Sequence, residues 1–169
     1  MRTAAYKADA ASDRHRRENV PRHILCAITD WKGKIMELFL GGCYQGKKEY
    51  VLKLHPECKG QVIEGENLPA DSDGMIKELQ EFENPVINHL HLWVRKCLEQ
   101  QADVELLTDK LLEAYPGLIF ICDEIGNGIV PMDAFEREYR EQTGRILIEL
   151  AKEAEEVIRV ICGIGQKIK

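Results

Sequence analysis

The sequence predicts an α/β fold with a mostly parallel sheet and helices on both of its faces. From residue 35 onwards, short apolar runs alternate with segments in which apolar residues recur at helical spacing, the pattern of consecutive strand–helix units. The apolar run 118–122 is continuous, which is typical of a strand covered on both faces. The chain has 169 residues, of which 44% are hydrophobic and 31% charged, enough for one domain with its own core.

The first elements are two strands joined by a helix. The apolar run 36–40 predicts a strand, and the glycine pair 41–42 ends it. A helical pattern follows over about 46–54 and stops at a His-Pro pair, so His55 is expected to lie at the helix end. The run 61–64 predicts a second, short strand.

The middle of the chain continues the alternation. The short polar residues 71–73 can cap a helix, and apolar residues at helical spacing follow them as far as Phe82. A strand is predicted over 85–90 and one long helix over 92–114, where a Tyr-Pro-Gly sequence breaks the pattern. The buried strand 118–122 comes next.

A last helix and a last strand close the chain. The helix is predicted over about 132–154, with an apolar stripe that indicates packing on a sheet. The stripe consists of Met132, Phe135, Tyr139, Ile146, Leu150 and Ala154. The apolar run 157–161 predicts the final strand.

The composition excludes several classes of protein. A chain with a net charge of −6 is a poor general binder of nucleic acid, because such binding depends on neutralising phosphates. No apolar run approaches the roughly 18 residues that span a bilayer, so no membrane partner is expected. The six cysteines form no CxxC pair and no spacing typical of zinc ligands. Reduced thiols in a cytoplasmic protein are the simplest interpretation.

Residues 1–34 differ in charge from the rest of the chain. They hold eight basic and four acidic residues, a net charge of +4, whereas the other 135 residues carry −10. They lack the apolar stretch and the cleavage site of a secretory signal. We expect 1–34 to be a dispensable basic leader, either disordered or a non-native start ahead of Met36. The alternative is a basic arm that binds an acidic partner.

A phosphate-binding motif lies between the first predicted strand and the first predicted helix. It reads GxxxxGK, in the strand–loop–helix context that such a loop requires. Its glycines let backbone N–H groups point at phosphate oxygens, and the following helix adds its positive N-terminus. Lys47 is expected to reach the β- and γ-phosphates and to act in catalysis. The candidate nucleotide-binding residues are Gly41, Gly42, Cys43, Tyr44, Gln45, Gly46, Lys47 and Lys48.

One position of this motif departs from the standard pattern. A Ser or Thr hydroxyl normally binds Mg²⁺ there, but the chain has Lys48, whose ammonium has no lone pair and repels a cation. Either other groups hold the metal or Lys48 changes the chemistry, so we expect a weakened Mg²⁺ site with unknown ligands. The alternative is a glycine-rich turn that binds no ligand. The context favours the first interpretation and makes 35–169 a P-loop nucleotide-binding domain.

A second motif follows the continuous strand 118–122. Asp123 and Glu124 are placed where α/β proteins bind ligands, at the carboxyl end of a strand. Either could hold magnesium through water or accept a proton from an attacking hydroxyl. Arg137 and Arg140 fall on one side of the last predicted helix and could clamp phosphate. The alternative is that both arginines pair with neighbouring glutamates in solvent.

Several segments resemble the bifunctional adenosylcobinamide kinase / adenosylcobinamide-phosphate guanylyltransferase family of cobalamin biosynthesis. The stretch 121–169 carries the most specific similarity. The matching residues there are Glu124–Pro131, Arg137, Tyr139, Arg140, Gly144, Arg145, Ala151, Ala154, Val157, Gly163–Gly165 and Lys167–Lys169. The segment 37–47 aligns with the family's first strand and phosphate loop, and 86–93 aligns with a later strand.

The resemblance implies a P-loop fold of the RecA-like kind, which in this family is often assembled as a trimer. It implies phosphorylation of the hydroxyl of a cobinamide-type corrinoid with ATP or GTP as the substrate nucleotide. It further implies GMP transfer through a covalent guanylyl-histidine. In this chain Lys47 would hold the nucleotide phosphates, and Glu124 would serve near the metal or the substrate hydroxyl.

Some features depart from the family pattern. Lys48 replaces the hydroxyl residue, and Asn88 stands where the family has an acidic residue. The stretch 47–88 is shorter and lacks the segment with the guanylylated histidine, so we expect the guanylyltransferase half to be lost. His89 and His91, two apart on a predicted strand, are expected to share one face and to be structural. The sequence thus predicts a cobinamide kinase-like phosphotransferase, with a catalytically reduced, regulatory or assembly nucleotide-binding protein as the alternative.

Overall fold

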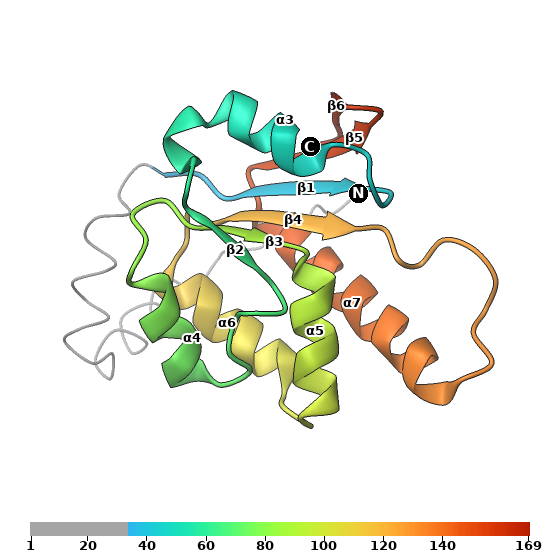
Figure 1. Ribbon diagram of the computed structural model, residues 1–169. Helices are drawn as coiled ribbons and strands as arrows, with labels where there is room; N and C mark the ends of the chain where they lie inside the picture. Colours follow the sequence, from blue (N-terminus) through green and yellow to red (C-terminus); the bar gives the residue numbers. More distant parts are fainter. Residues whose placement is uncertain (1–33) are drawn as a thin grey trace, which may run out of the picture.

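The computed structural model describes residues 34–169 and contains a six-stranded sheet with helices on both faces (Figure 1). Apart from Lys34, the predicted leader 1–34 lies outside the described residues. The elements are β1 (Glu37–Gly41), α3 (Lys47–Leu54), η2 (Pro56–Cys58), β2 (Val62–Glu64), α4 (Ser72–Leu79), β3 (Val86–Asn88), α5 (Leu90–Glu99), α6 (Val104–Ala114), β4 (Ile119–Asp123), α7 (Ala134–Glu153), β5 (Glu156–Ile161) and β6 (Ile164–Lys167).

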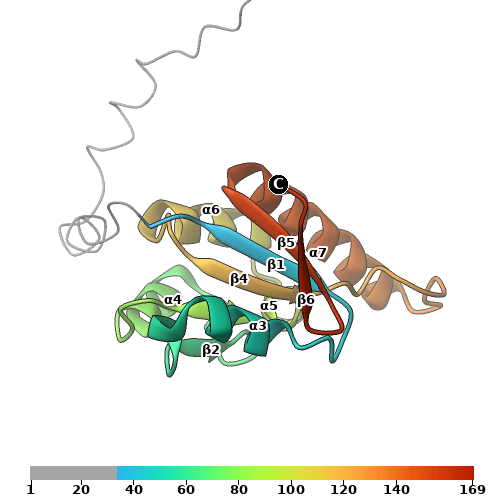
Figure 2. The same cartoon turned by 90° about the horizontal axis from the view of Figure 1, so that it is seen from above.

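The strand order determines which loops meet. The order is β2-β3-β4-β1-β5-β6, and every neighbouring pair is parallel except the antiparallel pair β5–β6 (Figure 2). After β1, the strands β2, β3 and β4 lie on one side of β1 in the sheet, and β5 lies on its other side. The strand order therefore reverses at β1. In open α/β sheets this is where ligands bind, at the carboxyl ends of the strands.

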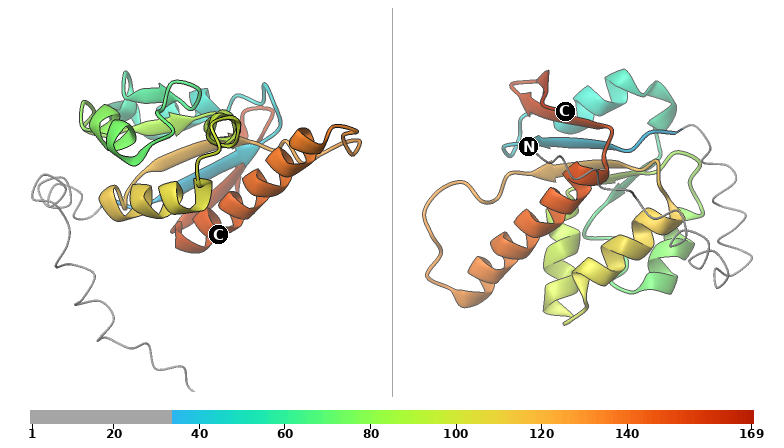
Figure 3. Two further views of the ribbon diagram at one scale, coloured as in Figure 1. Left: turned by 90° about the horizontal axis from the view of Figure 1, so that it is seen from below. Right: turned by 180° about the vertical axis from the view of Figure 1, so that it is seen from behind.

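The two faces of the sheet bury different sets of side chains. Alternate residues of a strand point to opposite faces. Phe39 of β1 packs in a small cluster with Val51 of α3, whereas its neighbour Leu38 belongs to the larger cluster, which holds the buried residues of α4, α5, α6 and α7. Figure 3 shows these four helices together on one side of the sheet. This confirms the predicted α/β architecture.

The predicted helix 92–114 is wrong, because the structure contains two helices there. α5 ends at Glu99, Gln101 adopts a left-handed backbone with φ of 55°, and α6 begins at Val104. The Asp103 carboxylate caps α6 by accepting the Leu106 N–H at 3.0 Å. The apolar spacing continues across this break, so the periodicity alone did not reveal it.

Several other elements also differ from the prediction. β3 covers only 86–88 of the predicted strand, and α5 begins at Leu90. The last helix begins at Ala134, where the Asp133 carboxylate caps it by accepting the Glu136 N–H. β6 was not predicted, because its glycine and polar residues give no apolar alternation. Among the described residues, no helix is long and apolar enough to cross a membrane.

Candidate nucleotide-binding site

The predicted phosphate loop joins the carboxyl end of β1 to the first turn of α3. Two of its residues have left-handed backbones, Tyr44 with φ of 56° and Gly46 with φ of 77°. Gly46 directly precedes the helix, so the loop curls and α3 directs its N-terminus at the interior of the curl. A Cβ atom on Gly41 would collide with the Val160 carbonyl oxygen of β5, which explains why glycine is required there.

The turn between β5 and β6 holds this loop from outside. The Gln45 side-chain oxygen accepts the Cys162 N–H at 2.7 Å, and the Gln45 carbonyl accepts the Gly163 N–H at 2.9 Å. Cys43 and Tyr44 lie at the exposed tip of the loop. The loop is therefore fixed at its base and open at its tip.

Lys47 is buried inside the curl of its own loop. Its ammonium forms an ion pair with the Asp123 carboxylate at 2.6 Å and donates to the Gly42 carbonyl at 2.7 Å. The parallel pairing of β1 and β4 sets this contact, because it places Gly41 opposite Asp123. Burial acts to raise the pKa of Asp123, but Lys47 outweighs burial and lowers it. The two predicted motifs thus meet at one edge of the sheet.

Lys48 is tied to a second carboxylate at the same edge. Its ammonium lies 2.8 Å from Oε1 of Glu64, the last residue of β2. The other oxygen, Oε2, accepts from the Asn88 amide at 2.6 Å and lies 2.9 Å from Nδ1 of His89. Burial acts to raise the pKa of Glu64, but the hydrogen bonds from Lys48 and Asn88 outweigh it and lower the pKa. We call Lys48, Glu64, Asn88 and His89 the β2-edge network.

His91 connects this network to Asp123. The predicted shared strand face of His89 and His91 is wrong, since His89 precedes α5 with φ of 52° and His91 lies within that helix. Their rings nevertheless meet edge to face, with centroids 5.6 Å apart. Nδ1 of the buried His91 accepts the Asp123 N–H at 3.4 Å. Burial lowers the pKa of His91, so this histidine is neutral at pH 7.

Glu124 stands just outside this buried group. Its Oε2 accepts from Arg159 of β5 at 2.8 Å and from the Asn127 amide at 3.1 Å. Among the described residues, none hydrogen-bonds to Oε1 of Glu124. The carboxylate is therefore oriented by two donors while one oxygen is left for another partner.

Arg137 and Arg140 hold the loop that follows Glu124. Arg137 donates to the carbonyls of Pro131 and Met132, at 3.0 and 2.6 Å, and Arg140 donates to the carbonyl of Ile129 at 2.9 Å. Both arginines use backbone oxygens as partners, and neither makes the alternative ion pairs with neighbouring glutamates. Figure 1 shows this loop running out from the sheet between β4 and α7.

Sequence reasoning missed two residues of the site. Glu64 ends the predicted strand 61–64, and it was a visible candidate because it is a carboxylate at a strand end. Arg159 lies inside the last predicted strand, and its contact with Glu124 depends on β5 lying two strands from β4. The positions of both residues follow from the strand order, which the spacing of residues does not give.

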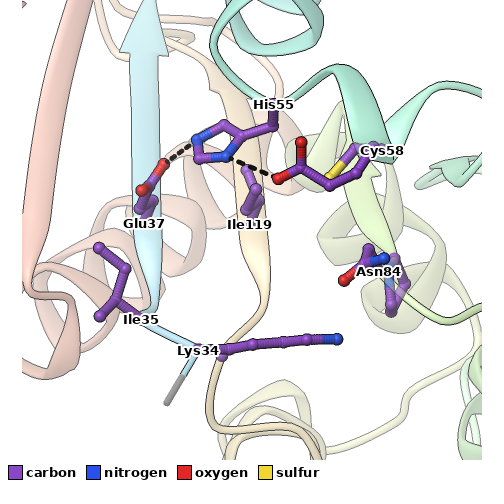
Figure 4. A pocket seen from close by; sticks show the side chains of 10 residues that line it. Lys34, Ile35, Glu37, His55, Cys58, Asn84 and Ile119 are labelled. Carbon is purple, nitrogen blue, oxygen red and sulfur yellow. Dashed lines mark hydrogen bonds and ion pairs between the residues drawn. The ribbon is translucent and has the colours of Figure 1, made fainter.

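A small cavity of about 200 Å³ lies at the opposite edge of the sheet (Figure 4). His55 borders it and binds Glu37 at 2.7 Å and Glu57 at 3.4 Å. His55 is the residue at the end of α3, as predicted. Because Glu37 begins β1 whereas the phosphate loop follows its other end, this cavity is separate from the nucleotide-binding candidate.

Comparison with known proteins matches the larger part of the chain to one family. The model of the cobinamide kinase / cobinamide phosphate guanyltransferase family matches residues 52–168. The bifunctional adenosylcobalamin biosynthesis protein CobU of Escherichia coli K12 is 34% identical over 79 residues, which are 46% of this chain and 44% of that protein. Its counterpart from Salmonella typhimurium LT2 is 33% identical over the same shares. The chain thus matches less than half the length of these curated relatives.

Proposed function

Because the chain belongs to the cobinamide kinase / cobinamide phosphate guanyltransferase family, we propose that it is a nucleotide-dependent phosphotransferase acting on a cobinamide-type corrinoid. The nucleotide would be ATP or GTP, and the acceptor would be a hydroxyl of the corrinoid. The observation that carries this proposal is the meeting of the phosphate loop with Asp123 and Glu124 at one edge of the sheet. The family match begins inside α3, so the loop is an independent line of support.

Phosphoryl transfer requires mainly positioning and charge neutralisation. The loop amides and Lys47 would bind the phosphates, with Lys47 exchanging its present bonds for phosphate oxygens. Oε1 of Glu124 would accept the proton of the substrate hydroxyl. The hydroxyl oxygen would then attack the γ-phosphorus, and the nucleoside diphosphate would leave. Arg159 and Asn127 orient the Glu124 carboxylate for this role.

The loop held by Arg137 and Arg140 supports a corrinoid as the second substrate. It presents three apolar side chains to solvent, with Ile129 91%, Val130 71% and Met132 96% exposed. A corrinoid has a wide, partly apolar ring, and the loop directly follows Glu124. In this proposal the two arginines position the loop through its backbone, and they act on phosphate only if those bonds break.

Magnesium does not fit the residues present. Lys48 occupies the position of the usual hydroxyl ligand, and Asn88 donates its amide to Glu64. No step of the proposed transfer is therefore routed through a metal.

The guanylyltransferase half is proposed to be absent. Of the described histidines, His55 lies at the far edge of the sheet, and His91 is buried against Asp123. Nδ1 of His89 is held by Glu64. We further propose that the protein works in the cytoplasm and, by similarity to its family, as a trimer.

One observation favours the alternative of a catalytically reduced nucleotide-binding protein. Both residues that depart from the family pattern, Lys48 and Asn88, bind the same carboxylate, Glu64. They thus form a coherent network in place of a metal site. In this alternative the protein binds nucleotide in a regulatory or assembly role and transfers no phosphoryl group.

Transfer of radiolabel from γ-labelled ATP or GTP to cobinamide tests the proposal. Wild type should label cobinamide, and Glu124→Gln should lower the rate by about 10² to 10⁴-fold with nucleotide affinity unchanged. Lys47→Ala should abolish both binding and transfer. The matched control is Lys53→Ala, which removes an exposed charge from the same helix and should leave the rate unaltered. Nucleotide binding without any labelling would support the alternative function instead.

A further inference from the structure

We propose that Lys48 takes the place of the divalent cation, so that this chain binds a nucleoside triphosphate without magnesium. The proposal deepens the proposed function and rests on it. It concerns how the negative charge of the phosphates is neutralised. It predicts a binding site whose affinity is the same when divalent ions are removed.

Lys48 occupies the position of the motif that normally serves the metal ion. It follows Lys47 directly and lies in the first turn of α3, where the motif otherwise supplies a hydroxyl ligand for Mg²⁺. Lysine has three N–H donors and no lone pair when charged, so it cannot be a metal ligand. It can donate directly to phosphate oxygens, the same atoms that a metal ion would coordinate.

The three carboxylates at this edge, Asp123, Glu64 and Glu124, each already bind a cationic side chain, which is Arg159 in the case of Glu124. Asp123 binds Lys47 at 2.6 Å, and Glu64 binds Lys48 at 2.8 Å. A divalent cation brought here would meet these positive side chains and would have to displace them from their partners. The arrangement therefore disfavours a metal ion electrostatically, in addition to lacking the usual hydroxyl ligand.

Lys48 is held in position by its partners and is still accessible to solvent. Glu64 holds the ammonium with one oxygen, while Asn88 and His89 fix the other oxygen. The side chain of Lys48 is 40% exposed, in contrast to 5% for Lys47. Because one contact to Glu64 uses one donor, the remaining donors of Lys48 can meet an incoming phosphate. The β2-edge network thus holds the ammonium group of Lys48 in position to serve as the cation of the site.

Calorimetric titration of ATP into the full chain, in excess EDTA and then in excess Mg²⁺, tests this inference. Wild type should bind with the same Kd in both solutions. Lys48→Ser, which restores the usual hydroxyl, should lose about tenfold or more in EDTA, as expected for a charge-assisted hydrogen bond, and should recover in Mg²⁺. Lys48→Arg should keep binding that resists EDTA. Lys53→Ala, the control for charge on α3, should behave as wild type.

The outcomes separate this inference from the proposed function. Wild-type binding that disappears in EDTA and returns with Mg²⁺ would overturn the role of Lys48 while leaving the nucleotide site intact. No binding of ATP or GTP in either solution would overturn both. A thermal melt of each variant shows whether it folds. If Lys48→Ser does not fold, the binding of ATP by Lys48→Arg in EDTA decides whether Lys48 replaces the metal ion.

Discussion

At the scale of single residues, the site consists of two ion pairs with different exposure. The Lys47–Asp123 pair is buried beneath the phosphate loop, whereas the Lys48–Glu64 pair is partly exposed. A buried charge that loses its partner is strongly destabilising, whereas an exposed pair contributes little to stability. The first pair therefore belongs to the fold as much as to the site, and the second is free to serve binding.

His91 gives this edge of the sheet a dependence on pH. Burial lowers its pKa from 6.5 to about 4, and it faces Asp123, His89 and Lys47. The unfolded chain therefore takes up the proton first as pH falls. The contribution of neutral His91 to the stability of the fold is fully present above about pH 6.5. It is lost as the pH falls towards about 4.

Thermal melts at about pH 7.5 and about pH 5 check this expectation. The melting temperature of wild type should be lower at the acidic pH than at the neutral one. His91→Gln, which keeps a hydrogen-bond acceptor but does not titrate, should show a smaller fall. An equal fall in both proteins would show that His91 is not the group that titrates.

At the scale of elements, the phosphate loop depends on the packing of β1 against β5. Gly41→Ala should destabilise the protein by about 1–3 kcal/mol, because the added methyl group meets the rigid Val160 carbonyl. Chemical denaturation measures this change. Gly126→Ala is the matched control, since a Cβ there would meet nothing within 4 Å, and its stability should equal that of wild type. Equal stability of the two variants would contradict this account of Gly41.

The elements also show where sequence reasoning reached its limit. Strong apolar runs were placed correctly, since β1, β4 and β5 all match their predicted segments. The break between α5 and α6 was missed because apolar spacing continues across it, although Asp103 is a good capping residue. His89 was assigned to a strand because the apolar run continues past it, whereas its backbone turns left-handed and starts α5. The capping residue Asp103 and the left-handed backbone of His89 set these boundaries, which the apolar periodicity does not reveal.

At the scale of the whole molecule, the order of the strands in the sheet brings the residues of the site together. Five segments meet at one edge: the phosphate loop, the ends of β2, β3 and β4, and the side of β5 that carries Arg159. The sequence predicted two of them, the loop and the Asp123-Glu124 pair, because each carries a recognisable motif. The contacts of Glu64 with Lys48 and of Arg159 with Glu124 could not be predicted, because they depend on which strands lie side by side in the sheet.

Acidity is also a property of the whole chain. Residues 35–169 carry a net charge of −10, and yet the proposed ligand is a triphosphate. Binding therefore depends on local positive groups, the loop amides and the two lysines, and not on overall attraction. The loop amides and these lysines therefore decide whether the chain binds a triphosphate.

A crystal structure with a non-hydrolysable GTP analogue would show whether the phosphate loop binds the triphosphate. We expect the phosphates inside the curl of residues 42–48, hydrogen-bonded to its amides, with Lys47 moved from the Gly42 carbonyl to a phosphate oxygen. An analogue bound elsewhere, with Lys47 still on Gly42 and Asp123, would contradict this expectation.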